Sequence, residues 1–137
     1  SFSSFIGGVA GAIPPLIGWA ALDPGLGGPA LPLFGLLVLW QQAHVRALGL
    51  KREGEYAAAG IPLPSLGLLV WVALLIPYPA LFLGGLGSGT IAALGGLAGL
   101  WLLAGLILRR GDWGQLMFRL SLAWLILAFA AMIVGAF

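Results

Sequence analysis

Five apolar runs, each long enough to cross a lipid bilayer, constrain this chain more than any other feature. They lie near residues 3–22, 29–50, 64–83, 87–108 and 115–137. The hydrocarbon core of a bilayer is about 30 Å thick, and a helix of roughly 20 apolar residues crosses it. Strands of a membrane β-barrel would be about half as long and would alternate in polarity. The sequence therefore predicts an all-α integral membrane protein, a single domain of five transmembrane helices.

Composition and charge agree with a membrane protein and exclude several functions. With 61% hydrophobic and 7% charged residues, a chain of 137 residues carries more apolar surface than a soluble core of that size buries. The net charge of +2 comes from so few ionic groups that no basic patch for a nucleic acid exists. The lack of cysteine excludes disulfides, thiolate metal sites and a cysteine nucleophile. Because the chain starts at Ser1 rather than Met, we expect processing or an upstream segment.

The basic residues predict how the helices are oriented. They flank two loops: Arg46, Lys51 and Arg52 the loop after the second run, and Arg109, Arg110 and Arg119 the loop after the fourth. Two helices separate these loops, so both loops lie on one face, which the positive-inside rule assigns to the cytoplasm. Five helices then place the Ser1 end inside and the Phe137 end outside an inner (plasma) membrane.

Most of the polar chemistry lies in residues 40–56, which read WQQAHVRALGLKREGEY. On a helix, Gln41, His44 and Lys51 share one stripe, whereas Gln42 and Arg46 point roughly the other way. Polar groups at this depth face a bundle interior or a wet cavity. Residue types alone favour a hydrogen-bonded bundle histidine and basic residues that extend to the membrane surface. At this point a structural and a functional interpretation both stand.

Proline and glycine predict local features of the helices. Pro14 and Pro15 lie inside the first run, and each removes a backbone donor. We therefore predict a kink or an unwound turn between Ile13 and Leu16. The Gly-rich stretches GGLAGL and LAGL predict close packing between helices.

Four stretches carry a resemblance to a known family: IGGVAGAIPPLIGWAAL, LWQQAHVRALGL, EYAAAGIPLP and FRLSLAWLILAFAAMIV. In this order and spacing they resemble the heme O synthases, the protoheme IX farnesyltransferases among the UbiA-type membrane prenyltransferases. The most specific piece is GAIPPLIGWAA, because hydropathy alone does not demand a Pro-Pro pair followed by Gly-Trp. The resemblance spans essentially the whole chain. It implies a UbiA-type helical bundle, with these five helices as the C-terminal part of a nine-helix protein.

The resemblance also implies a reaction and its residues. Farnesyl diphosphate ionises, a vinyl group of heme B attacks the allylic carbon, and water completes a hydroxyethylfarnesyl group. By resemblance His44, Glu55 and Tyr56 are catalytic, with Glu55 as a ligand of Mg²⁺, and Lys51 and Arg52 bind the diphosphate. These side chains are expected to converge beneath a cavity of the bundle.

Departures from the family leave alternatives open. Where the family commonly has Pro-His-Phe-Trp, residues 43–46 of this chain read Ala-His-Val-Arg. Glu55 stands where the family usually has Asp. The first Asp-rich motif of the family has no counterpart here, so the active site needs a missing N-terminal half or a partner chain. The alternative is a degenerate, non-catalytic membrane subunit of a respiratory or heme-handling complex. A weaker possibility is a heme-binding protein with His44 as axial ligand. A respiratory oxidase or heme A synthase is an expected partner in either role.

Overall fold

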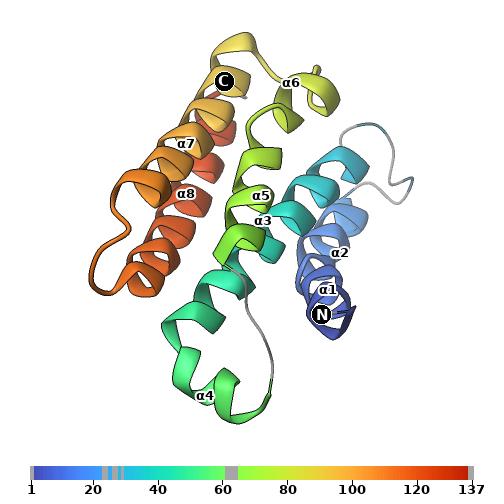
Figure 1. Cartoon of the computed structure of the whole chain (residues 1–137). Coiled ribbons are helices and arrows are strands. Elements are labelled where there is room, and N and C mark those ends of the chain that lie inside the picture. Colours follow the sequence, from blue (N-terminus) through green and yellow to red (C-terminus); the bar gives the residue numbers. More distant parts are fainter. Residues whose placement is uncertain (1, 23–24, 26–27, 29, 61–64, 136–137) are drawn as a thin grey trace.

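The chain folds as a bundle of α-helices around one central helix. The computed structural model describes residues 2–22, 25, 28, 30–60 and 65–135 and contains no strand among them. The helices are α1 (Phe2–Gly11), α2 (Ile13–Leu22), α3 (Ala30–Lys51), α4 (Glu53–Ala58), α5 (Ser65–Leu75), α6 (Tyr78–Phe82), α7 (Ser88–Ile107) and α8 (Trp113–Gly135). Helix α3 packs against α8, α5 and α1, and α7 packs against α8 and α5 (Figure 1). The prediction of an all-α membrane bundle is confirmed.

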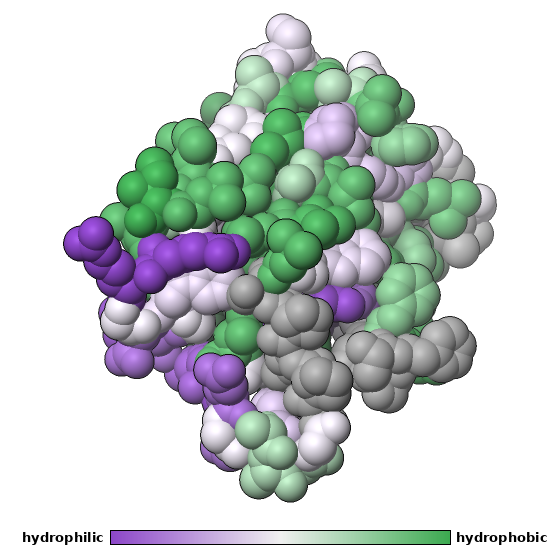
Figure 2. All heavy atoms as spheres, viewed as in Figure 1, coloured by the Kyte–Doolittle hydropathy of each residue, from purple (hydrophilic) through white to green (hydrophobic). Residues whose placement is uncertain are grey.

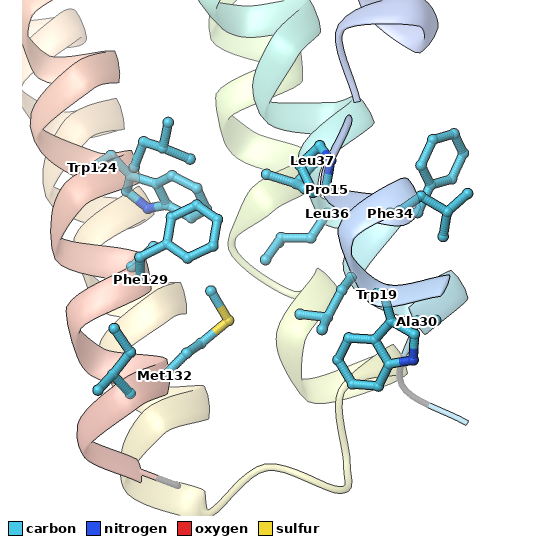
Figure 3. Close-up of a pocket in the computed structure, with 14 residues that line it drawn as sticks. Pro15, Trp19, Ala30, Phe34, Leu36, Leu37, Trp124, Phe129 and Met132 are labelled. Carbon is cyan, nitrogen blue, oxygen red and sulfur yellow. The ribbon is translucent and has the colours of Figure 1, made fainter. Parts of the chain in front are cut away.

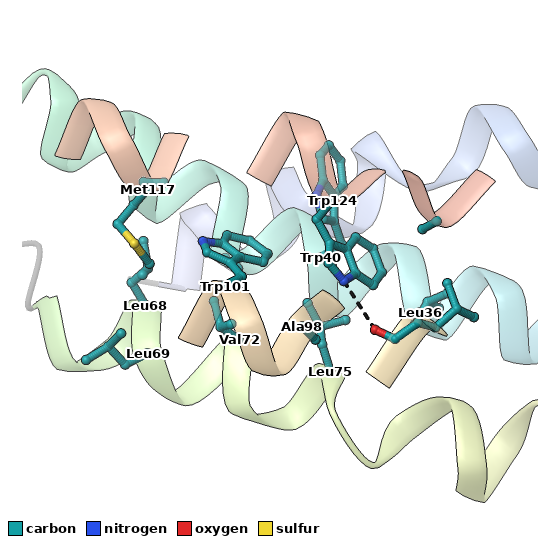
Figure 4. Packing of buried hydrophobic residues seen from close by; sticks show 14 of the residues in the cluster. Leu36, Trp40, Leu68, Leu69, Val72, Leu75, Ala98, Trp101, Met117 and Trp124 are labelled. Atoms are coloured by element: carbon teal, nitrogen blue, oxygen red, sulfur yellow. Dashed lines mark hydrogen bonds between the residues drawn. The ribbon is translucent and has the colours of Figure 1, made fainter. Parts of the chain in front are cut away.

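One spacing of inward-facing residues builds the core. Buried positions recur at intervals of four, three and four residues on three long helices, which brings each set onto one face. They are Leu36, Trp40, Ala43 and Ala47 on α3, Leu94, Ala98, Trp101 and Gly105 on α7, and Met117, Ser121, Trp124 and Ala128 on α8. Figure 4 shows the large rings of Trp40, Trp101 and Trp124 packed beside aliphatic side chains from α5. Small residues between the indoles let the helices approach closely.

The first predicted helix is interrupted, one residue before the predicted place. Helix α1 ends at Gly11, Ala12 forms a turn, and α2 begins at Ile13. The Ala12 N–H bonds to the Val9 carbonyl at 3.1 Å in a tighter turn. Because Pro14 and Pro15 then lie in the first turn of α2, where a backbone donor has no helical partner, they cost this helix little. The predicted position is therefore wrong, because residues 13–16 are regular helix and the break lies at Ala12, just before them.

The third predicted helix, near 64–83, is two helices in the structure. Helix α5 ends at Leu75 and α6 begins at Tyr78. Pro77 has no N–H to offer the Ala73 carbonyl, which instead accepts a bond from the Ile76 N–H at 3.2 Å. Helix α7 packs close to this break, since a Cβ at Gly95 would lie 2.8 Å from the Ile76 carbonyl oxygen. The other predicted segments correspond to α3, α7 and α8, while residues 29, 64, 136 and 137 and Ser1 lie outside the described residues.

Candidate functional site

The two basic loops lie at the same end of the bundle. The start of α8 lies so close to the end of α3 that a Cβ added at Gly114 would lie 2.7 Å from the backbone nitrogen of Lys51. A polar pocket of about 500 Å³ opens there. Its lining comes from the end of α3, the start of α4, the α7–α8 turn and the first turns of α8: Leu50, Lys51, Glu53, Gly111, Asp112, Trp113, Gly114, Gln115 and Arg119. Figure 2 shows hydrophilic side chains gathered at this end and apolar surface over the helices above it.

His44 is half-buried between α3 and α8 and is held from three sides. Its ring stacks on Trp40, with centroids 4.8 Å apart and planes 17° apart, and lies 5.1 Å from the ring of Phe118. Its Nδ1 lies 2.8 Å from the hydroxyl oxygen of Ser121. The Trp40 indole also donates to the Ser121 carbonyl oxygen at 2.8 Å. These three contacts place the His44 ring against α8.

Lys51 and His44 share one aromatic neighbour, Phe118. The ammonium nitrogen of Lys51 is 4.5 Å from the centroid of the Phe118 ring, within the range of a cation–π interaction. Phe118 therefore contacts both the histidine and the lysine. Lys51 also lines the polar pocket, so its ammonium group and the Phe118 ring lie at the same end of the bundle.

Arg52, Glu55 and Tyr56 lie farther out, at and on the short helix α4. The Arg52 guanidinium and the Glu55 carboxylate are 3.7 Å apart, and their side chains are 57% and 72% exposed. Tyr56 is half-buried. No hydrogen bond or ion pair among the described residues joins this group to His44 and Lys51. The structure thus divides the predicted site into two groups. One lies around Phe118, where His44 is half-buried and Lys51 exposed, and the other lies at α4.

A second polar network on α3 was not predicted from the sequence. Gln42 is fully buried, and its side-chain amide donates to the Phe5 carbonyl oxygen at 3.2 Å. Arg46 donates to both the backbone and the side-chain oxygen of Gln42 at 3.0 Å and lies 5.3 Å over the Trp71 ring. Gly8 on α1 leaves the space that the Gln42 amide fills. The i, i+4 spacing of Gln42 and Arg46 was a visible signal for this pair.

An apolar pocket of about 250 Å³ lies between α2, α3 and α8 (Figure 3). Trp124, Phe129 and Met132 line it from α8, opposite Leu36 and Leu37 from α3. Pro15 and Trp19 of the predicted Pro-Pro and Gly-Trp motif complete the wall on α2. This motif therefore shapes a cavity as well as interrupting a helix.

The described residues do not assemble a full metal site. No group of three or more His, Cys, Asp or Glu side chains lies close enough among them to hold an ion. Glu55 offers an accessible carboxylate, the kind of ligand that Mg²⁺ takes from proteins along with phosphate oxygens and water.

Fold and composition define the class of protein. Among the described residues, Phe5–Leu22, Ser88–Ile107 and Trp113–Gly135 are long and apolar enough to cross a membrane, so the chain is a multi-pass helical membrane protein. It is homologous to protoheme IX farnesyltransferases over nearly its whole length. It is 41% identical to the protoheme IX farnesyltransferase of Bacillus licheniformis, with 96% of this chain and 47% of the relative covered.

Other relatives give the same result. The protoheme IX farnesyltransferase of Staphylococcus carnosus is 38% identical and protoheme IX farnesyltransferase 2 of Bacillus subtilis is 40% identical, each over 98% of this chain and 48% of the relative. The chain spans about half the length of the curated relatives it matches. No family model matches the chain, and no solved structure matches it. The resemblance to heme O synthases found in the sequence is confirmed by these relatives.

Proposed function

We propose that this chain supplies the C-terminal half of a heme O synthase, which transfers a farnesyl group from farnesyl diphosphate to protoheme IX. The observation that carries the proposal is the 38–41% identity to protoheme IX farnesyltransferases over 96–100% of the chain. The resemblance of residues 118–134 to the last helix of that family supports the C-terminal assignment. The same relatives favour an enzyme over a non-catalytic membrane subunit.

The polar end of the bundle supports diphosphate binding. Lys51 and Arg52 bring two cations to the end of α3, and charge-assisted hydrogen bonds to phosphate are the strong ones. Glu55, in this proposal, holds Mg²⁺ together with a carboxylate from the other half of the enzyme. The ion would neutralise charge on the diphosphate leaving group. Tyr56 lies next to Glu55 on α4, at the rim of this end.

The apolar pocket suits the far end of a prenyl chain. Leu37 in its wall precedes Lys51 by 14 residues on α3, which is about 21 Å along a helix. If the diphosphate binds at Lys51, the distal isoprene units of the farnesyl chain therefore extend to this apolar pocket. Its aromatic and aliphatic lining matches their apolar surface.

Location and partners follow from the same proposal. The basic end, with the Ser1 end of the chain, faces the cytoplasm in an inner membrane, and Phe137 faces outward. A respiratory oxidase or heme A synthase is a partner that would take the product. Both assignments rest on the positive-inside rule and on the chemistry of the product.

Coexpression tests the proposal. The chain is produced with the complementary half of a protoheme IX farnesyltransferase in cells that make no heme O, and extracted hemes are identified by mass. We expect heme O only when both halves are present, and neither half alone to produce it. Two halves that insert and copurify yet form no heme O with both substrates supplied would contradict the enzyme assignment.

A further inference from the structure

The surroundings of His44 determine which of its ring nitrogens carries the proton. The Ser121 hydroxyl oxygen lies 2.6 Å from the Phe118 carbonyl oxygen and 2.8 Å from the His44 Nδ1. A hydroxyl has one proton to donate, whereas a carbonyl oxygen has none. Two oxygens at 2.6 Å repel unless that proton lies between them, so Ser121 donates to Phe118.

The consequence for His44 follows from the remaining contact. With its proton given to the Phe118 carbonyl, the Ser121 oxygen meets Nδ1 only as an acceptor. Nδ1 must then be the protonated nitrogen, and in a neutral ring Nε2 keeps a free lone pair. Among the described residues, no hydrogen bond to Nε2 of His44 is present.

We propose that Ser121 is a positioning residue that holds His44 in the Nδ1–H tautomer, so that Nε2 is the acceptor nitrogen offered to the reaction. This inference rests on the proposed function, with His44 as the catalytic residue that the resemblance to heme O synthases implies. A hydrogen bond on one ring nitrogen generally fixes the tautomer and orientation of a working histidine.

Ser121 is itself held in place by the neighbouring helix. The Trp40 indole donates to the Ser121 carbonyl oxygen, and the Trp40 ring stacks on His44 one turn away. The carbonyl oxygen of Phe118, one turn before Ser121, accepts the hydroxyl proton, and the Phe118 ring lies 5.1 Å from the histidine ring with the planes tilted by 33°. The hydrogen bonds of Ser121 and the two ring contacts of His44 therefore all come from α3 and α8.

Nitrogen NMR measures this tautomer directly on the chain. His44 is the only histidine, so ¹⁵N-histidine labelling gives one ring in detergent micelles. In a neutral imidazole the unprotonated nitrogen resonates far downfield of the protonated one, and couplings to the ring protons identify each. We expect Nε2 to be the downfield nitrogen. A downfield Nδ1 would overturn the proposal.

Two variants separate positioning from packing. Ser121→Ala removes the acceptor, and we expect the ring to shift toward the Nε2–H form that free imidazole favours. Ser121→Thr keeps a hydroxyl that bonds to a carbonyl three or four residues back in a helix, so the Nδ1–H form should return. If Ser121→Ala retains the wild-type tautomer in a protein with unchanged helicity, Ser121 does not position the ring.

An activity measurement then connects the tautomer to the reaction. In the two-half enzyme, we expect Ser121→Ala to lower heme O turnover about tenfold, the value of one lost hydrogen bond, and Ser121→Thr to restore it. A tautomer that changes without any loss of turnover would overturn the role of Nε2. The NMR measurement of the tautomer needs no substrate, so it remains valid even if the two-half enzyme forms no heme O. Failure of the tautomer assignment can therefore be distinguished from failure of the proposed function.

Discussion

The polar segment from Gln41 to Tyr56 has an embedded part on α3 and an exposed part on α4, and the two differ in what holds them. In the embedded part, Gln42 bonds to Phe5 and Arg46, and His44 bonds to Ser121. In the exposed part, Arg52 and Glu55 share one ion pair at 3.7 Å, largely in solvent. An exposed pair of this kind contributes little to stability.

This difference separates structural from chemical roles. Removing a buried partner leaves a polar group in an apolar interior, which costs free energy of folding. Removing an exposed side chain leaves the fold unchanged, so an effect on activity then reports contact with substrate or metal. The predictions below run from the largest expected effect to the smallest.

Glu55→Gln should give the largest loss of activity with no loss of stability. The substitution keeps the shape and removes the charge that a Mg²⁺ ligand needs. We expect heme O formation by the two-half enzyme to fall on the order of a hundredfold, while the melting temperature in detergent stays constant. Arg110→Gln is the control, because Arg110 is an exposed charged residue at the same end that does not line the polar pocket. Equal turnover in the two variants would remove Glu55 from the metal site.

Gln42→Leu should give the largest loss of stability. It removes the acceptor of Arg46 and the donor to Phe5 in a fully buried place. We expect about 2–3 kcal/mol of destabilisation, measured by denaturation in mixed micelles. Gln41→Leu makes the same chemical change one position away, where the side chain is only half-buried and has no hydrogen bond among the described contacts. A similar loss in both variants would contradict the structural role of the Gln42 network.

Lys51→Ala should lower the apparent affinity of the enzyme for farnesyl diphosphate. The loss of a single phosphate contact is expected to raise the farnesyl diphosphate concentration for half-maximal rate about tenfold, with the heme requirement unchanged. Arg109→Ala is the control, since Arg109 lies over Trp113 at the same end but outside the polar pocket. A rise in the heme requirement instead would place Lys51 at the other substrate.

Cysteine labelling tests on which side of the membrane the exposed part lies. The introduced cysteines should differ only in their accessibility to the thiol reagent. The chain has no cysteine of its own. In intact cells, cysteines at Gly54 and Arg110 should resist a membrane-impermeant thiol reagent, and one at Ser88, at the opposite end of α7, should react. The reverse pattern would invert the orientation and move the polar pocket to the outer face.

The sequence predicted the helical class, the approximate segments and the interruption near Pro14, because hydropathy and proline act locally. It missed the break at Pro77, although the residues IPYP carried the same local signal. It could not predict that His44 meets Ser121, since 77 residues separate them and only packing of α3 on α8 joins them. It also assigned Gln42 and Arg46 to a stripe without a role, because burial of Gln42 depends on the glycine at position 8 of another helix.

The bond between Trp40 and Ser121 has a consequence for synthesis of the protein. Of the described helices, α3 is not among those apolar enough by composition alone to cross a membrane, and part of its polar surface is satisfied by α8. These partners are 81 residues apart, so at ribosomal rates of about 5–20 residues per second α8 emerges roughly 4 to 16 seconds after α3. During that interval the insertion machinery or an earlier helix must cover the Trp40 indole and the His44 imidazole. Membrane insertion of α3 is then completed when α8 packs against it.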